Sequence, residues 1–172
     1  AAAVLVVAAV GTGAVAAQTT YANAQGPDNP LVQYAQPSGQ MQATLADIEE
    51  RAESNQGVDV LFYGEEFYNA EEASGGTPGF RIDDYDEPDD RGGGYEGWFD
   101  RLPLPWYLDT YGANVSSTTD PGAVANSSAP VVVTLEGAEK PIREGLEARG
   151  YDRVVHQGYQ HSRPVVFYVA PS

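Results

Sequence analysis

The fold class is decided by residues 130–169, "PVVVTLEGAEKPIREGLEARGYDRVVHQGYQHSRPVVFYV", where the hydrophobic pattern changes from strand to helix and back to strand. The opening "PVVVTL" is a continuous apolar run, which is typical of a strand buried on both of its faces. Ala138, Ile142 and Leu146 then recur at the spacing of one helix face, with a proline near the start and a glycine at the end. The pattern predicts a buried strand followed by a short amphipathic helix.

Two more strand-like runs complete this part of the chain, "YDRVVHQGY" at residues 151–159 and "RPVVFYV" at residues 163–169. Only a short turn separates them, so we expect them to pair as an antiparallel hairpin. A strand, a helix and then strands in this order favour a layered arrangement. The predicted fold class is therefore α/β, a small mixed sheet with flanking helices.

Upstream of this unit, the sequence predicts one more helix and one more buried strand. Met41, Leu45 and Ile48 lie on one face at helical spacing, while the acidic residues around them lie mostly on the other side. The run "VDVLFY", residues 58–63, has the near-continuous hydrophobicity of a strand in a parallel sheet. Residues 64–97 are rich in glycine, acids and turn formers, and we interpret them as a loop.

The string "WFDRLPLPWYLDTYG", residues 98–112, concentrates aromatic side chains around two prolines. Pro105 can occupy the first helical position, where its missing N–H costs nothing, and Gly112 can end the helix. The aromatic side chains could anchor the helix in the core, stack on a sugar or rest on a membrane. We expect most of them to anchor the helix to the sheet, with one exposed ring, Trp106 or Tyr107.

The charge of the chain is extreme, with 25 acidic residues against 9 basic ones and a net charge of −16. Such self-repulsion is relieved where concentrated salt screens it, so we interpret the composition as haloarchaeal. No cluster of Lys and Arg exists in the sequence that could neutralise phosphates, which argues against nucleic acid as a partner. The chain has no cysteine, which excludes disulfides, thiolate metal sites and cysteine nucleophiles.

The amino-terminal residues differ from the rest, because residues 1–17, "AAAVLVVAAVGTGAVAA", carry no charge. The run is slightly shorter than a full membrane span and lacks the basic start of a signal peptide. We favour the end of a transmembrane helix, with a signal-like segment or a buried helix as alternatives. The predicted organisation is a membrane segment at 1–18, an extended tether at 19–38 and an extracytoplasmic α/β domain at 39–172, located at the cell membrane.

Few residues have the spacing of a catalytic or metal site. Glu65 and Glu66 follow a predicted strand, where carboxylates can line an α/β crevice, but neighbouring residues at a strand end point in opposite directions. His156 and His161 have no third ligand at a suggestive spacing, and the acidic run at 83–90 does not match a calcium loop. We expect hydrogen-bonded or solvated histidines, no metal, no cofactor and no catalytic residue. A hydrolase that uses Glu65 or Glu66 is a further alternative.

Two N-x-S/T sequons, at Asn114 and Asn126, agree with a location outside the cell. Asn114 and Asn126 are therefore the candidate N-glycosylation sites of the chain.

Three features taken together resemble a known family. They are the apolar run that leads into "YANAQGPDNPLVQYAQPSGQ", the strand "DVLFYGEE" and the string "LPLPWYLDTYG". The chain is similar to the C-terminal, extracytoplasmic part of the haloarchaeal flippase-activity-associated membrane proteins. These belong to the protein-mannosyltransferase-like group of polyprenyl-phosphate-sugar-dependent glycosyltransferases. The resemblance covers most of the chain and is least clear across residues 69–96, which look like an insertion.

The resemblance implies that the chain is the external cap of a multi-spanning protein whose catalytic acid lies upstream, so no catalytic residue is carried over. It implies a lipid-linked glycan or sugar donor, the membrane and glycosylation-pathway proteins as partners in surface-protein N-glycosylation. Candidate substrate contacts are four side chains, Trp106, Tyr107, Tyr34 and Glu65. The alternative function is a secreted or membrane-anchored surface protein with a structural or adhesive role.

Overall fold

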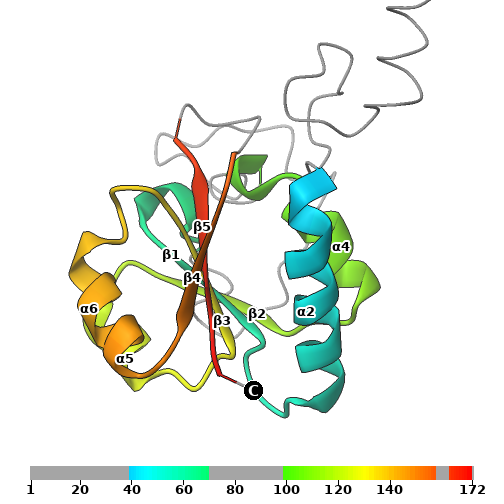
Figure 1. Cartoon of the computed structure of the whole chain (residues 1–172), viewed down its shortest axis with the longest axis horizontal. Coiled ribbons are helices and arrows are strands. Elements are labelled where there is room, and N and C mark those ends of the chain that lie inside the picture. Colours follow the sequence, from blue (N-terminus) through cyan, green and yellow to red (C-terminus); the bar gives the residue numbers. More distant parts are fainter. Residues whose placement is uncertain (1–38, 70–98, 158–162, 172) are drawn as a thin grey trace, which may run out of the picture.

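The computed structural model describes residues 39–69, 99–157 and 163–171, and these residues form one mixed sheet between two layers of helices (Figure 1). The strands are β1 (Val60–Tyr63), β2 (Val115–Thr118), β3 (Val131–Leu135), β4 (Asp152–His156) and β5 (Val165–Val169). Their order across the sheet is β2-β1-β3-β5-β4. The predicted α/β class, a small mixed sheet with flanking helices, is confirmed.

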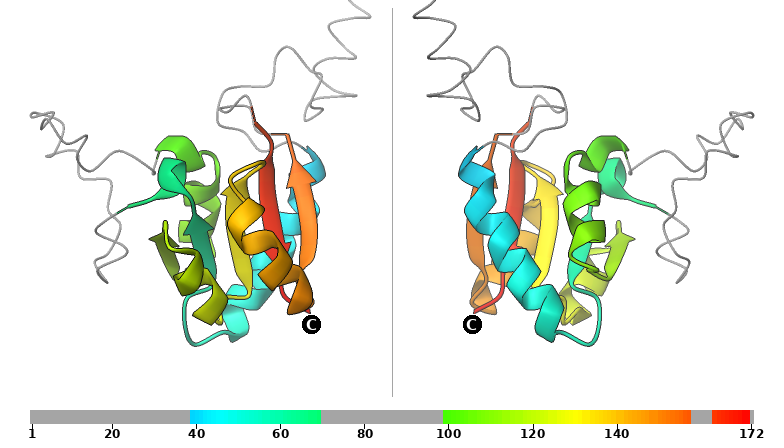
Figure 2. Two further views of the ribbon diagram at one scale, coloured as in Figure 1. Left: turned by 90° about the vertical axis from the view of Figure 1, so that its left-hand side faces the viewer. Right: turned by 90° about the vertical axis from the view of Figure 1, so that its right-hand side faces the viewer.

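Four α-helices flank this sheet in the described residues, α2 (Gln42–Ser54), α4 (Leu104–Thr110), α5 (Pro121–Asn126) and α6 (Lys140–Ala148). Short 3₁₀ turns precede or join them, namely η2 (Gly39–Met41), η3 (Glu65–Phe67) and η5 (Phe99–Arg101). Helices α2 and α4 cover one face of the sheet, and α5 and α6 cover the other. Figure 2 shows each face in turn, with α6 in front in the left view and α2 in front in the right view.

The central strands form the parallel part of the sheet. β1 pairs in parallel with both β2 and β3, so that Phe62 lies opposite Ser117 on one side and Val133 on the other. Every residue of β1 and of β3 is buried, because helices cover both faces of these strands. The sequence-based prediction of two fully buried strands is confirmed.

The last two strands form the antiparallel part. β5 runs antiparallel to both β3 and β4, with Val166 opposite Thr134 and Val155. β4 therefore points in the same direction as β1, β2 and β3. The carboxyl ends of these four strands and the amino end of β5 lie together, at what we call the carboxyl end of the sheet. The opposite side is the amino end.

On the face covered by α2 and α4, aliphatic side chains make the main contacts. Met41, Leu45 and Ile48 are each 2% exposed or less, which confirms the predicted helix stripe. Helix α4 is held by Leu104 and Leu108, which are also buried. Tyr107 and Tyr111 are partly buried and pack against the same core, so the expectation that aromatic side chains anchor this helix is confirmed for these two residues. The two leucines are further anchors that the sequence analysis did not name.

The edge strand β2, and helix α5 on the other face of the sheet, are elements that sequence reasoning did not anticipate. Asp120 caps α5, because its Oδ1 accepts a hydrogen bond of 2.8 Å from the N–H of Gly122. The guanidinium of Arg149 donates to the carbonyl oxygens of Val124 at 3.2 Å and Ser127 at 2.6 Å. These bonds tie the end of α5 to the end of α6.

Several predicted features lie outside the described residues. They are the membrane segment at 1–18, the tether at 19–38 with Tyr34, the acidic run at 83–90, and His161. Among the residues that are described, no helix combines the length and the apolar character needed to cross a membrane.

His156, at the end of β4, joins the hairpin to α2. Its Nε2 lies 2.8 Å from the hydroxyl of Thr44 in α2, and its ring makes an edge contact with Phe167. The side chain is buried, its Nδ1 has no hydrogen-bond partner among the described residues, and burial lowers its pKa below the ordinary 6.5. The expectation of a hydrogen-bonded histidine is confirmed for this residue.

A pH dependence of stability follows from this buried imidazole. Because its pKa is lower in the folded chain, the unfolded chain binds more protons once the pH falls below 6.5, and the free energy of unfolding decreases. We expect unfolding in concentrated salt to show this loss between pH 7 and pH 5.5, and the His156→Gln variant to show a flatter profile. Parallel profiles for the two proteins would contradict the assignment.

Candidate functional site at the carboxyl end of the sheet

After the neighbouring parallel strands β1 and β3, the chain continues on opposite faces of the sheet, starting from the carboxyl end. β1 is followed by η3, whose Phe67 packs on the face of α2 and α4. β3 is followed by α6 on the opposite face. In open α/β sheets, the place where such connections diverge is the crevice in which ligands bind. The ends of β1 and β3 are therefore the first place to look for a site.

A glycine turn brings the ends of these two strands close together. Gly64, directly after β1, has φ of 118°, a value that residues with side chains rarely adopt. A Cβ at this position would lie 3.8 Å from the Cβ of Ala138 and 3.9 Å from Oγ1 of Thr134. Thr134 is fully buried, and its hydroxyl has no hydrogen-bond partner among the described residues. The turn after β1 thus lies in van der Waals contact with the residues at the end of β3, beside one unpaired hydroxyl.

Glu65 and Glu66 have different surroundings at this crevice. Glu66 forms an ion pair with Arg163, which precedes β5. Because β3 lies between β1 and β5 in the sheet, this pair reaches over the end of β3. Glu65 is exposed to solvent. The two carboxylates therefore do not act as a pair, and only Glu65 presents its charge openly to a ligand.

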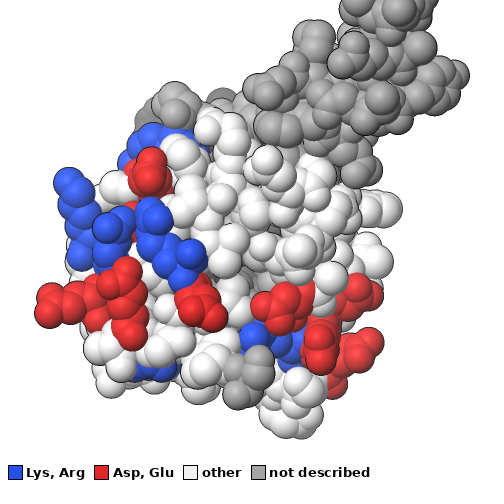
Figure 3. All heavy atoms as spheres, in the orientation of Figure 1, with Lys and Arg blue, Asp and Glu red and all other residues white. Residues whose placement is uncertain are grey.

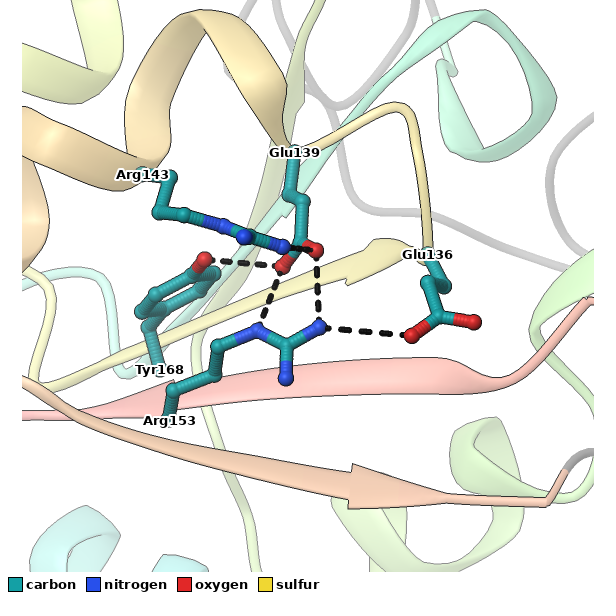
Figure 4. Close-up of polar contacts among 5 residues, drawn as sticks. All are labelled: Glu136, Glu139, Arg143, Arg153 and Tyr168. Atoms are coloured by element: carbon teal, nitrogen blue, oxygen red, sulfur yellow. Dashed lines mark hydrogen bonds and ion pairs between the residues drawn. The ribbon is translucent and has the colours of Figure 1, made fainter.

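A second polar cluster lies under the start of α6, as Figure 4 shows. The carboxylate of Glu139 is fully buried and accepts hydrogen bonds from Arg153, at 2.9 Å from Nε and 2.7 Å from a terminal nitrogen. The hydroxyl of Tyr168 donates to the same carboxylate at 2.8 Å. Arg143, one turn further along α6, also pairs with it. The cluster joins α6 to β4 and β5.

The electrostatics show that this cluster is structural. Burial alone would raise the pKa of Glu139, but hydrogen bonds from Arg153, Tyr168 and Arg143 outweigh it and lower the pKa to about 2. Burial, helped by the hydrogen bond to Glu139, raises the pKa of Tyr168 to about 12. Neither group changes its protonation near neutral pH, so neither can serve as a general acid or base. The hydrogen bonds of this cluster hold α6 against β4 and β5.

At the surface above this cluster, basic side chains gather with acidic side chains beside them. Figure 3 shows Lys and Arg next to Asp and Glu on this side of the molecule. Glu136 lies 3.5 Å from Arg153, and Glu66 pairs with Arg163. Each of these pairs places an acidic side chain against a basic one at the surface.

Of the three aromatic residues named as candidate substrate contacts, only one is exposed at the carboxyl end of the sheet within the described residues. Trp106, in the first turn of α4, is 72% exposed and is the exposed ring that the sequence led us to expect. Tyr107 is half-buried and packs against the core. Tyr34 lies outside the described residues. Glu65 and Trp106 are therefore the two candidates that the structure places in the open at the carboxyl end.

Both sequons lie at the amino end of the sheet. Asn114 is exposed immediately before β2, and Asn126 is exposed at the last position of α5. The side-chain amide of Asn126 donates to the carbonyl of Gly122 at 2.9 Å. Within the described ranges, no group of three or more histidine or acidic side chains could hold a metal ion.

Comparison with known proteins identifies a matching family. A family model described as the Agl23 flippase-associated protein C-terminal domain matches residues 41–170. The match begins just before α2 and ends just after β5, so it spans the whole described fold. It agrees with the family that the sequence motifs resemble. No curated protein and no solved structure was found to match the chain.

The role of Glu139 can be tested by its effect on stability. Replacing one member of a buried ion pair leaves its partners without compensation and typically destabilises by about 3–5 kcal/mol. Because Arg153 and Arg143 are partly exposed, we expect Glu139→Gln to lower the free energy of unfolding by about 3 kcal/mol in denaturant titrations. The matched control is Glu136→Gln, which removes a half-exposed carboxylate and should change stability by less than about 1 kcal/mol. Equal effects of the two substitutions would refute this role.

Proposed function

Because the chain belongs to the Agl23 flippase-associated protein C-terminal domain family, we propose that it is a membrane-tethered, extracytoplasmic domain that handles lipid-linked glycans. The observation that carries this proposal is the family match over residues 41–170. The uncharged residues 1–17 support attachment to a membrane. The exposed sequons at Asn114 and Asn126 support an outside location.

We further propose that the domain caps a multi-spanning, glycosyltransferase-like protein and contributes binding, while the chemistry takes place elsewhere in that protein. The polar groups inside the described fold support a binding role. Glu139 and Tyr168 keep their protonation states near neutral pH, and His156 is buried under α2. A domain of this kind positions a substrate and excludes water for a catalytic group that another part of the protein supplies.

The carboxyl end of the sheet is the proposed place of contact with the glycan. Open α/β sheets bind ligands there, and Glu65 offers an exposed carboxylate beside the turn at Gly64. A carboxylate accepts hydrogen bonds from sugar hydroxyls, and such charge-assisted bonds are among the stronger ones. Glu66 and Arg163 form a partly exposed pair next to it that can turn further donors and acceptors toward the sugar.

Binding can be measured directly with the detergent-solubilised chain. We expect saturable heat in calorimetric titrations with a short-chain polyprenyl-linked oligosaccharide in multimolar KCl. Loss of a charge-assisted hydrogen bond costs about 1.5–3 kcal/mol, so Glu65→Gln should weaken binding about tenfold or more.

The control for this titration is Glu147→Gln, which removes an exposed carboxylate near the far end of α6. It should bind as the unchanged chain does. If the unchanged chain gives no saturable heat, the proposed function is wrong. If Glu65→Gln and Glu147→Gln both bind normally, Glu65 is not part of the site.

A further inference from the structure

Trp106 is the most exposed large hydrophobic side chain among the described residues. Its helix is held to the sheet from the opposite side by Leu104 and Leu108. Tyr107 turns toward the core, and its ring centre lies 6.2 Å from that of Tyr111. The packing of α4 in the described structure therefore does not depend on the indole of Trp106. Exposing this apolar ring to water has an unfavourable free energy. This ring is the part of α4 available to an outside partner.

The position of Trp106 in the fold is defined by the turns around it. Helix α4 begins at the carboxyl end, because η5 before it is bound to η3 after β1, with Nε of Arg101 donating to the carbonyl of Phe67 at 3.1 Å. Helix α2 begins at the same end, where Thr44 meets His156. Figure 2 shows the amino ends of both helices at the same end of the sheet. Trp106, in the first turn of α4, therefore lies at the end where the described chain begins.

The length of the upstream segment keeps this end near any anchor that precedes it. Gly39, the first described residue, directly precedes α2, so residues 1–38 join the fold at the carboxyl end. Residues 18–38 can span no more than about 75 Å even at full extension. With residues 1–17 in a bilayer, the carboxyl end stays within that distance. A tethered surface meets its partner at high effective concentration, so even a weak contact becomes populated.

The amino end of the sheet has the opposite character. It carries both sequons, Asn114 and Asn126, with exposed side chains. The chain also ends there, because Pro171 follows β5 and lies beside Gly150. An orientation with the carboxyl end toward the bilayer leaves both asparagines accessible to glycosylation away from the lipid.

Electrostatic attraction cannot hold the carboxyl end of the sheet against a bilayer. With a net charge of −16, the chain is repelled by anionic lipids at low salt. At 1 M salt the Debye length falls to about 3 Å, which removes most of that repulsion. A contact made by an indole therefore persists or strengthens as salt is added, whereas a contact made by basic residues would weaken.

We propose that the domain rests on the bilayer with the carboxyl end of its sheet, and that Trp106 enters the lipid–water interface. An indole suits this position because its body is apolar and its N–H can bond to headgroups or water, which is why tryptophan is enriched there. The inference rests on the membrane tether of the proposed function. It adds the orientation of the domain and the residue that makes the contact, with lipid as the partner.

The experiment measures the depth of the ring in vesicles that carry the full 172-residue chain. The Trp98→Phe substitution leaves Trp106 as the only tryptophan, and lipids brominated close to the headgroups quench indoles at the interface. We expect the fluorescence of Trp106 to fall at least twofold in brominated vesicles at multimolar KCl. Its emission should shift to shorter wavelength, and iodide should quench it poorly.

The matched control places an indole at the other end of the domain. A chain with Trp98→Phe, Trp106→Phe and Asn126→Trp should show little quenching by brominated lipid and strong quenching by iodide. Equal lipid quenching of both proteins, or none for Trp106, would overturn the proposal, as would failure of the chain to float with vesicles. Quenching that appears only after glycan lipid is added would also overturn it, because the ring would then contact the glycan.

These outcomes are separable from those of the proposed function. Lipid quenching of Trp106 together with absent glycan binding would refute glycan handling and leave the orientation intact. Saturable glycan binding that depends on Glu65, with Trp106 fully exposed to iodide in vesicles, would support the function and refute the orientation.

Discussion

The buried carboxylate of Glu139 is the constraint on which the arrangement of this domain depends. It lies at the start of α6 with no exposure to solvent, and it is held by Arg153 from β4 and Tyr168 from β5. An uncompensated carboxylate in this place would be strongly unfavourable, so α6 can pack here only when both strands of the hairpin are in register beneath it. The position of α6 in turn constrains the turn that follows β3, at the carboxyl end of the sheet.

The other end of the sheet is tied in the same way by a second buried carboxylate. Asp59 is 2% exposed, and its two oxygens accept hydrogen bonds from the side chain of Asn55 at 2.8 Å and the backbone N–H of Asn114 at 2.7 Å. These bonds join the end of α2, the start of β1 and the residues before β2. The described interior thus satisfies each of its buried carboxylates individually, and the other acidic side chains of the described residues are at least partly exposed, where salt can screen them.

How much the sequence could predict depends on how local each signal is. The stripe of Met41, Leu45 and Ile48 and the apolar runs of β1, β3 and β5 predicted their elements correctly, because periodicity alone reveals burial. The edge strand β2, "VSST", has no apolar run, although Asp120 before a proline was a usable start signal for α5. Glu139 looked like any solvated acid, because its partners Arg153 and Tyr168 come from other strands and only tertiary packing brings them together. The sequence could not decide whether Trp106 or Tyr107 is the exposed ring. In so short a helix, several leucines and aromatic residues could each contact the sheet, and only tertiary packing selects among them.

Arg101 fixes the turns at the carboxyl end of the sheet. Its guanidinium is buried, lies 4.2 Å from the ring centre of Phe62 in β1, and donates to the carbonyl of Phe67. The chain leaves the described structure at Asn69 and returns at Phe99, so this side chain holds the two ends of the intervening segment together. Once those ends are fixed, added length between them changes the closure entropy only slowly. The segment between those ends can therefore vary in length and sequence, while the hydrogen bonds made by Arg101, Glu139 and Asp59 keep the sheet and its helices in place.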